Sequence, residues 1–181
     1  MRRLTDAELV RQLMRALGAE ADEEVRIYFT GGTTAVLFGW RPTTIDVDLK
    51  LVPESERLLR AIPRLKEQLS VNIELASPAD FIPELRGWEE RSLFIAQEGR
   101  VSFYHYDLYA QALAKIERGH NQDLDDVRQM FRRGLIDPSE VRRRFQEIES
   151  GLYRYPAVDP RSFRQALDEA LKEAAGFPCG S

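Results

Sequence analysis

The chain has 181 residues, enough for one ordinary domain or for a small domain with a helical extension. Hydrophobic residues make up 43% and charged residues 31%, which is typical of a packed core with a strongly charged surface and argues against large-scale disorder. The formal net charge of -4 excludes a basic coat over the whole surface, although it leaves room for a local basic groove.

The first third of the chain predicts a helix, a strand, a tight turn and a second, short helix. Residues 5–8 (Thr-Asp-Ala-Glu) form a capping box, and the apolar residues that follow at helical spacing end near Gly18. Residues 25–29 are β-branched and aromatic and run into two glycines, which favours a strand and then a turn. Residues 33–40 form a compact apolar stretch and predict a short buried helix.

Two segments alternate with a period of two, as strands with one buried face do. In residues 44–51 we expect one face to carry Ile45, Val47, Leu49 and Leu51 and the other to carry Asp46, Asp48 and Lys50. In residues 71–75 we expect Val71, Ile73 and Leu75 to point inward and Asn72 and Glu74 outward.

A hairpin and then a series of helices are predicted for the rest of the chain. Residues 92–97 and 100–107 are strand candidates joined by a Glu-Gly turn. From residue 108 the pattern is helical, with Asn121 suited to cap one helix and Asp-Pro pairs that open two more. This order predicts an α+β fold, with a mixed-sheet core and flanking helices in residues 1–107 and a C-terminal helical region packed on it in residues 108–181.

Asp46 and Asp48 are the first candidates for chemistry. Two residues apart on a strand, their side chains leave the same face, with Cα atoms roughly 7 Å apart. Carboxylates at that spacing can converge on one hard cation such as Mg²⁺, which takes oxygen ligands. The same pattern also occurs on a strand face that is simply solvated, because antiparallel sheets commonly expose one side to water.

Gly31-Gly32-Thr33 follows an apolar strand and precedes a short helix. Glycines let the backbone approach a phosphate closely, and amides at the start of the helix would point at that phosphate. The hydroxyls of Thr33 and Thr34 could cap the helix or contact a nucleotide. A tight turn alone would also explain the glycines, so the pattern becomes informative together with the paired aspartates.

Strand, Gly-Gly-Thr turn, short helix and Asp-Val-Asp strand together resemble the nucleotidyltransferase (polymerase-β-like) superfamily. The resemblance implies a nucleotidyltransferase-like fold in which the glycine loop holds the triphosphate and the paired acidic residues hold Mg²⁺ or Mn²⁺. It assigns nucleotide binding to Gly31, Gly32 and Thr33, with Thr34 as a further candidate, and it assigns metal binding and catalysis to Asp46 and Asp48.

The superfamily often adds a third carboxylate on a later strand. Glu74 is the candidate here, as a catalytic metal ligand or as a base, and Asp80 is a weaker alternative. An exposed glutamate on a strand would show the same pattern.

Residues 108–127 show a narrower resemblance, to AbiEii-type and related uncharacterised nucleotidyltransferase-like proteins of bacterial toxin–antitoxin and phage-defence settings. Lys115, Arg118, Asp123 and Asp126 match the charged positions of those proteins, whereas Gln122 stands where a second Lys is usual. The resemblance implies that Lys115 is catalytic and neutralises phosphate charge, and that Asp123 belongs to the nucleotide site. Alternatively, Lys115 could snorkel from an apolar seam and the aspartates could favour the first turn of a helix.

The leading hypothesis is a metal-dependent nucleotidyltransferase that transfers a nucleotidyl group from an NTP to RNA, such as the 3′ end of a tRNA, or to a protein hydroxyl. The alternative is a catalytically inactive protein of the same fold that acts as a nucleotide- or partner-binding module, which the missing second Lys favours. A metal-dependent sugar transferase is a third hypothesis, because Asp-x-Asp also occurs in that class.

A cytoplasmic protein without a membrane span is expected. The single cysteine, Cys179, cannot form a disulfide within one chain. Residues 4–17 mix charged and apolar residues and contain no apolar run of the kind found in a secretion signal or a membrane span.

Overall fold

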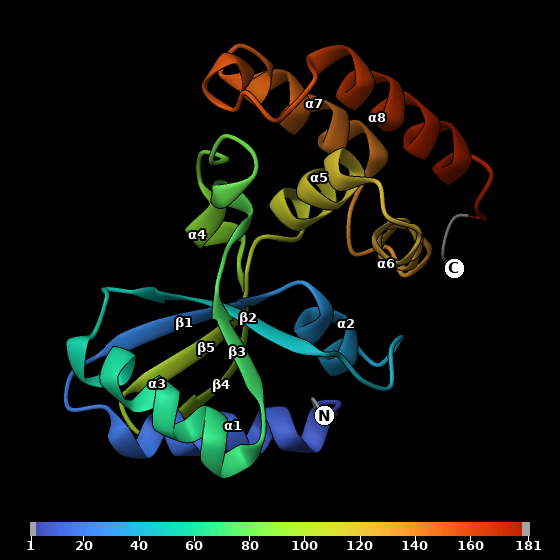
Figure 1. The fold of residues 1–181 in the computed structure, drawn as a ribbon. Coiled ribbons are helices and arrows are strands. Elements are labelled where there is room, and N and C mark those ends of the chain that lie inside the picture. The colour runs from blue at the N-terminus through green and yellow to red at the C-terminus, as the bar shows by residue number, and fades with distance from the viewer. Residues whose placement is uncertain (1–2, 179–181) are drawn as a thin grey trace. The chain divides into compact units, whose positions relative to one another are not determined.

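The computed structural model describes residues 3–178, so Cys179 lies outside the described residues. The chain forms two compact units, each described below by itself (Figure 1). The first contains the described residues up to Ser77 together with Ser92–Tyr106. The second contains Pro78–Arg91 and the described residues from Asp107 on. Sequence patterns suggested a division after residue 107 but did not suggest that residues 78–91 belong to the helical unit.

The first unit is a five-stranded mixed sheet with helices. Its elements are α1 (Ala7–Glu20), β1 (Val25–Thr30), α2 (Gly32–Phe38), β2 (Asp46–Val52), α3 (Glu56–Leu69), β3 (Asn72–Leu75), β4 (Leu93–Glu98) and β5 (Val101–His105). The strands are ordered β3-β2-β1-β5-β4, with β1 antiparallel to β2 and parallel to β5. β3 runs parallel to β2, and β4 runs antiparallel to β5. The predicted α+β class with a mixed sheet is therefore confirmed.

The second unit is helical. It contains α4 (Trp88–Arg91), α5 (Leu108–Arg118), α6 (Asn121–Arg132), α7 (Pro138–Glu149) and α8 (Pro160–Ala174), with short 3-10 turns at Pro78–Asp80 and Leu152–Arg154. Asp137 and Asp159 cap α7 and α8 as their Asp-Pro patterns predict. His120, not Asn121, is the N-cap residue of α6. Among the described residues of both units, no helix has the length and apolar character needed to cross a membrane.

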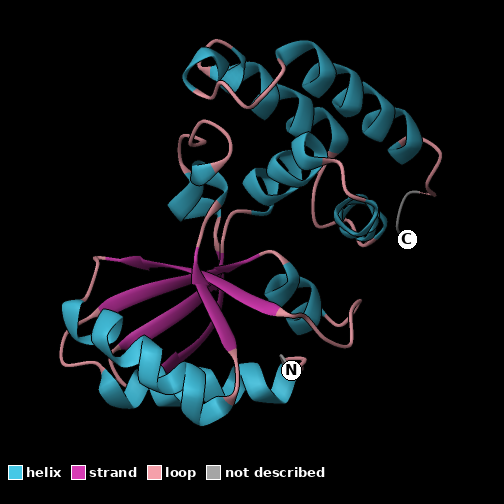
Figure 2. Cartoon of the chain, in the orientation of Figure 1, coloured by secondary structure: helices cyan, strands magenta, loops and turns pink. Residues whose placement is uncertain are grey.

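One face of the sheet forms the hydrophobic core with α1 and α3, which lie on the same side of the strands (Figure 2). Val47, Leu49 and Ile73 are buried there, as their alternation predicts. Ile45 and Leu75 were also expected to point inward, but they are 51% and 57% exposed. Ile45 precedes the paired part of β2 and Leu75 is the last residue of edge strand β3, so neither is covered by the core.

The start of α1 differs from the predicted capping box. Asp6 caps the helix by accepting a hydrogen bond from the backbone N–H of Leu9 at 2.8 Å. Thr5 was expected at this position, but its backbone pairs instead with that of Thr44, through N–H···O bonds of 2.8 and 2.9 Å. This pairing draws the segment before β2 toward the start of α1.

Gly18 does not end α1, which continues to Glu20. A Cβ atom on Gly18 would lie only 2.5 Å from the carbonyl oxygen of Glu98, in the β4–β5 hairpin. A Cβ atom on Gly99, the next residue of the turn, would in turn lie 2.7 Å from the carbonyl oxygen of Gly18. Gly18 is therefore required because a helix and a hairpin turn pack backbone against backbone.

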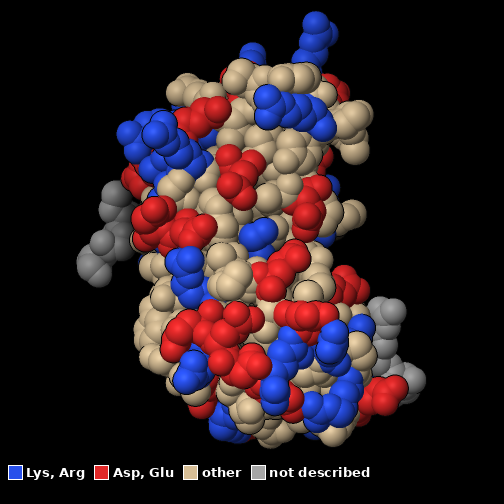
Figure 3. All heavy atoms as spheres, turned by 90° about the vertical axis from the view of Figure 1, so that its left-hand side faces the viewer, with Lys and Arg blue, Asp and Glu red and all other residues tan. Residues whose placement is uncertain are grey.

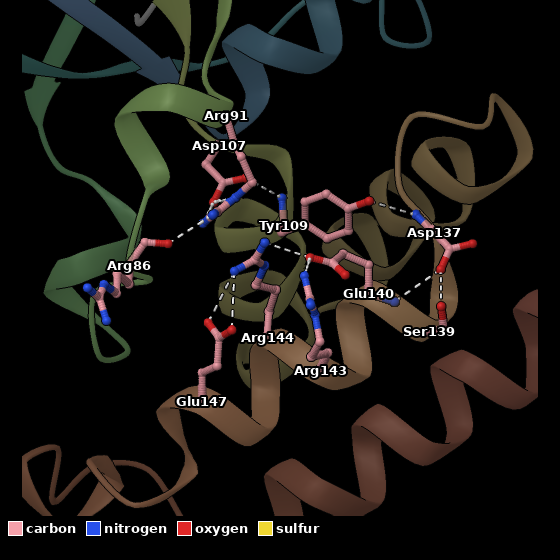
Figure 4. A network of polar contacts seen from close by, with 10 residues as sticks. All are labelled: Arg86, Arg91, Asp107, Tyr109, Asp137, Ser139, Glu140, Arg143, Arg144 and Glu147. Atoms are coloured by element: carbon pink, nitrogen blue, oxygen red, sulfur yellow. Dashed lines mark hydrogen bonds and ion pairs between the residues drawn. The ribbon is translucent and has the colours of Figure 1, made fainter.

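A polar network in the second unit surrounds the start of α5 (Figure 4). Asp107 caps α5 by accepting from the backbone N–H of Tyr109 at 3.1 Å. Arg91 donates to the same carboxylate through Nε at 3.1 Å and Nη2 at 2.7 Å, and its Nη1 donates to the carbonyl of Arg86 at 2.9 Å. Burial raises the pKa of Asp107, and the charge of Arg91 opposes that change. These contacts join residues 78–91 to α5 within one unit.

Gly18→Ala should destabilise the protein by about 1–3 kcal/mol, because the new methyl group would push against the backbone of the hairpin. An unconstrained glycine within a helix would behave in the opposite way, since alanine is the better helix former by about 1 kcal/mol. Urea unfolding followed by circular dichroism measures the difference. Ala19→Gly, at the exposed neighbouring position, is the control for helix propensity alone. A higher unfolding midpoint for Gly18→Ala would contradict the close packing.

Candidate functional site

The glycine turn after β1 lies against the carboxylate of Asp48. Gly31 has φ 64° and ψ -137°, a conformation that residues with a Cβ atom rarely adopt. A Cβ atom there would lie 2.8 Å from Oδ2 of Asp48. The contact follows from strand pairing, because Thr30, the last residue of β1, lies opposite Asp48 of β2. The two halves of the sequence motif therefore meet in space.

The second glycine makes room for the segment that leads into β2. A Cβ atom on Gly32 would lie 2.1 Å from Oγ1 and 2.8 Å from Cβ of Thr44. Oγ1 of Thr44 donates to the carbonyl of Asp46 at 3.1 Å. Thr44 thus connects the glycine turn to the first aspartate. Its position just before the Asp-Val-Asp pattern was the only sequence signal for this role.

Asp46 and Asp48 are half-buried on the face of β2 that points away from the hydrophobic core. The side-chain amide of Asn72, opposite Asp46 on β3, donates to Oδ1 of Asp46 and, at 3.3 Å, to Oε1 of Glu74. Glu74 itself is exposed and lies opposite Asp48. Asn72, which the sequence did not single out, therefore links the first predicted carboxylate to the third.

Two carboxylates suit Mg²⁺ better than they suit a metal ion that needs three or more protein ligands. Among the described residues, no three His, Cys, Asp or Glu side chains are placed to hold one ion together. Mg²⁺ commonly binds through one or two carboxylates, retained waters and substrate phosphates. Asp46 and Asp48 could supply those carboxylates beside the glycine turn, and the place of Glu74 in the metal site stays a prediction.

Thr33 and Thr34, in the first turn of α2, are fully buried. Oγ1 of Thr33 has no hydrogen-bond partner among the described residues. Oγ1 of Thr34 donates to the carbonyl of Phe29 at 3.5 Å and lies 3.1 Å from Nδ1 of His105, at the end of β5. Burial lowers the pKa of His105 to about 4. His105, whose ring also stacks on Phe38 at 4.5 Å, thus anchors α2 as a neutral imidazole, a role that sequence reasoning missed.

Lys115 and Asp123 belong to the second unit and bind one another there. Nζ of Lys115 is buried and donates to Asp126 at 2.7 Å and to Asp123 at 3.3 Å. Arg118 donates to both carboxylate oxygens of Asp123 at 3.0 Å. Burial tends to raise the pKa of Asp123, but the hydrogen bond from Arg118 and the charges of Lys115 and Arg118 outweigh it, so the pKa is lowered. The charged positions predicted from residues 108–127 therefore form one compact ion cluster.

Acidic and basic side chains are interspersed on the face of the molecule that Figure 3 displays. Elsewhere in the described residues, exposed ion pairs form within one unit, such as Arg60 with Glu56 on α3 and Arg142 with Asp168 between α7 and α8. Exposed pairs of this kind contribute little stability and cancel each other's long-range field. On that face, attraction of a polyanion would depend on local groups.

Replacing His105 by glutamine should flatten the pH dependence of stability between pH 6.5 and about 4. In the wild type, the contribution of the neutral ring is fully present above pH 6.5 and is lost as the pH falls toward about 4, because the unfolded chain binds the proton first. Across that interval the contribution of His105 to the free energy of unfolding should change by roughly 3 kcal/mol. Urea unfolding across this pH range measures it. His120→Gln, at an exposed position, should keep the wild-type slope, and an unchanged slope in His105→Gln would rule out the buried neutral ring.

Comparison with known proteins points to one family. Residues 7–168 match the family model described as nucleotidyltransferase of unknown function (DUF6036). No curated protein and no solved structure matched the chain. The family match spans the glycine turn, the paired aspartates and the ion cluster around Lys115. The chain therefore belongs to the nucleotidyltransferase family DUF6036.

Proposed function

We propose that the protein binds an NTP with Mg²⁺ at the Gly31-Gly32 turn and transfers its nucleotidyl group to a hydroxyl of an RNA or protein acceptor. The observation that carries this proposal is the approach of Gly31 to the carboxylate of Asp48, where a Cβ atom would lie 2.8 Å from Oδ2. A backbone that can cradle phosphates and a carboxylate pair that can bind their metal ion thus lie side by side. The acceptor classes and a toxin–antitoxin or phage-defence setting follow from the resemblance of the sequence.

In the proposed reaction, the oxygen of the acceptor hydroxyl forms a bond to the α-phosphorus of the NTP. The bond from that phosphorus to the α–β bridging oxygen breaks, and pyrophosphate leaves. Mg²⁺, when bound, would neutralise phosphate charge and align the reacting groups. Asp46 and Asp48 would hold that ion, and the exposed carboxylate of Glu74, one strand away, would take the proton of the hydroxyl.

The turn would bind phosphate mainly through close backbone contact. α2 has only seven residues, so its dipole adds little. Oγ1 of Thr33 is buried and has no partner among the described residues, so it would bind a phosphate oxygen only if the turn opened toward the ligand. Thr34 would act indirectly, because its hydroxyl is already held by His105 and Phe29.

Asp48→Asn should abolish metal-dependent ATP binding and lower nucleotidyl transfer by roughly 100-fold or more, because one of two metal carboxylates is lost. Calorimetric titration of each NTP with and without Mg²⁺ measures binding, and release of pyrophosphate measures transfer. Asp22→Asn, which changes an exposed carboxylate of the same unit, is the matched control. Full activity of a folded Asp48→Asn protein would overturn the metal role.

The second candidate function is a catalytically inactive module that binds a nucleotide or a partner protein. Two observations favour it: Lys115 is already neutralised by Asp123 and Asp126, and no three acidic side chains gather at the glycine turn among the described residues. In that case NTP binding would be independent of Mg²⁺ or absent. The same titrations therefore separate the two functions.

Lys115→Met should destabilise the second unit by about 3–5 kcal/mol, because buried carboxylates lose their partner. Lys172→Met, at an exposed position of α8, should have little effect. The double variant Lys115→Met/Asp126→Leu should recover much of the loss by replacing the pair with apolar groups. The ATP affinity of this double variant, measured by calorimetry, then tests whether Lys115 contacts a phosphate of the nucleotide. A tenfold loss would assign Lys115 to the nucleotide, and an unchanged value would confine it to the fold.

A further inference from the structure

Four side chains form a row across the sheet, on the face that carries the paired aspartates. Tyr28 of β1 lies opposite Lys50 of β2 on one side and opposite Tyr104 of β5 on the other. Tyr104 lies opposite Phe94 of edge strand β4. Residues that are opposite one another in paired strands share a face. The row therefore runs from a cation beside Asp48 to an aromatic ring at the edge of the sheet.

The three aromatic rings of this row, Tyr28, Tyr104 and Phe94, support one another. The rings of Tyr28 and Tyr104 stack with centroids 5.2 Å apart, and the ring of Phe94 meets that of Tyr104 edge-on at 5.7 Å. Tyr28 is only 1% exposed, whereas Phe94 is 60% exposed. The ring nearest to the aspartates is thus closed to ligands, and the ring farthest from them is open.

The open ring lies too far from the aspartates for the base of the NTP that they would bind. Three strand spacings of about 4.8 Å separate β2 from β4, or roughly 14 Å. A molecule that reaches both the reacting phosphate and Phe94 must be longer than one nucleotide. Lys50, in the row, and the exposed Arg26, two residues beyond Tyr28 on the side away from Asp48, lie on the same face and could contact phosphates there.

We propose that this face binds the acceptor as single-stranded RNA, with a base stacked on Phe94 and backbone phosphates near Lys50 and Arg26. This inference rests on the proposed nucleotidyl transfer and narrows its acceptor to a polynucleotide. Exposed aromatic rings bind unpaired bases of any sequence, because every base has a flat π-face. Tyr104 positions the stacking ring by its edge-on contact.

The mode of binding predicts a shallow salt dependence. Two cations on the face would contact about two phosphates, so the logarithm of the affinity should fall with the logarithm of salt concentration with a slope near -1.4. A protein that bound RNA through a broad basic surface would show a much steeper slope. The net charge of -4 agrees with a shallow dependence of affinity on salt concentration.

The test is fluorescence anisotropy of a labelled ten-nucleotide oligoadenylate titrated with the full chain. Phe94→Ala should weaken binding roughly 5- to 150-fold, the range for loss of one stacked base, and Phe94→Trp should restore it. Tyr153→Ala, which removes an aromatic ring that is 74% exposed in the second unit, should leave binding unchanged. Circular dichroism melts confirm that each variant is folded.

ATP affinity with Mg²⁺ is measured on the same proteins and should be unchanged in Phe94→Ala. If ATP binds but the oligonucleotide does not, the inference falls and the proposed function stands. The same holds if Phe94→Ala and Tyr153→Ala weaken oligonucleotide binding equally. If Phe94→Ala weakens ATP binding as much as it weakens oligonucleotide binding, the ring contacts the NTP and the inference is overturned. Oligonucleotide binding without ATP binding would support the RNA site and remove the proposed transfer. A smaller sedimenting mass for Phe94→Ala would instead make this face a contact between two copies and overturn the RNA site.

Discussion

The antiparallel pairing of β1 with β2 is the constraint on which the candidate site depends. It places Thr30 opposite Asp48, so the turn that follows β1 must pass the carboxylate at close range. Glycine suits this position because Gly31 has φ 64°, which residues with a side chain rarely adopt, and because a Cβ atom there would lie 2.8 Å from Oδ2 of Asp48. In the proposed function, a phosphate at this turn would therefore lie close to a metal ion held by the aspartates.

The alternation of side chains along β2 divides the chemistry of the first unit between two faces of one sheet. Val47 and Leu49 pack into the core with α1 and α3, while Asp46 and Asp48 leave the opposite face. The rigid packing of the first face fixes the geometry of the second. The strand register places Phe94, at the sheet edge, on the same face as the aspartates.

In the second unit, buried charge is held by neighbours of the same unit. Lys115 contacts Asp123 and Asp126, and Arg91 contacts Asp107. Because an isolated buried charge is costly, such groups occur in pairs or clusters. The carboxylates of Asp123 and Asp126 therefore account for the buried charge of Lys115 within its own unit.

The α+β class, the Gly-Gly turn and the Asp-x-Asp strand could be predicted from the sequence, because they depend on local propensity and on side-chain period. The sequence also indicated the family, since the motif residues are close together in the chain. Three-dimensional packing, in contrast, was needed to establish that Gly18 faces a hairpin, that Lys115 is neutralised and that His105 anchors α2. It alone decided that residues 78–91 join the helical unit and that Phe94 shares a face with the aspartates. These outcomes depend on which strands and helices become neighbours, and a local pattern of residues carries no record of that pairing.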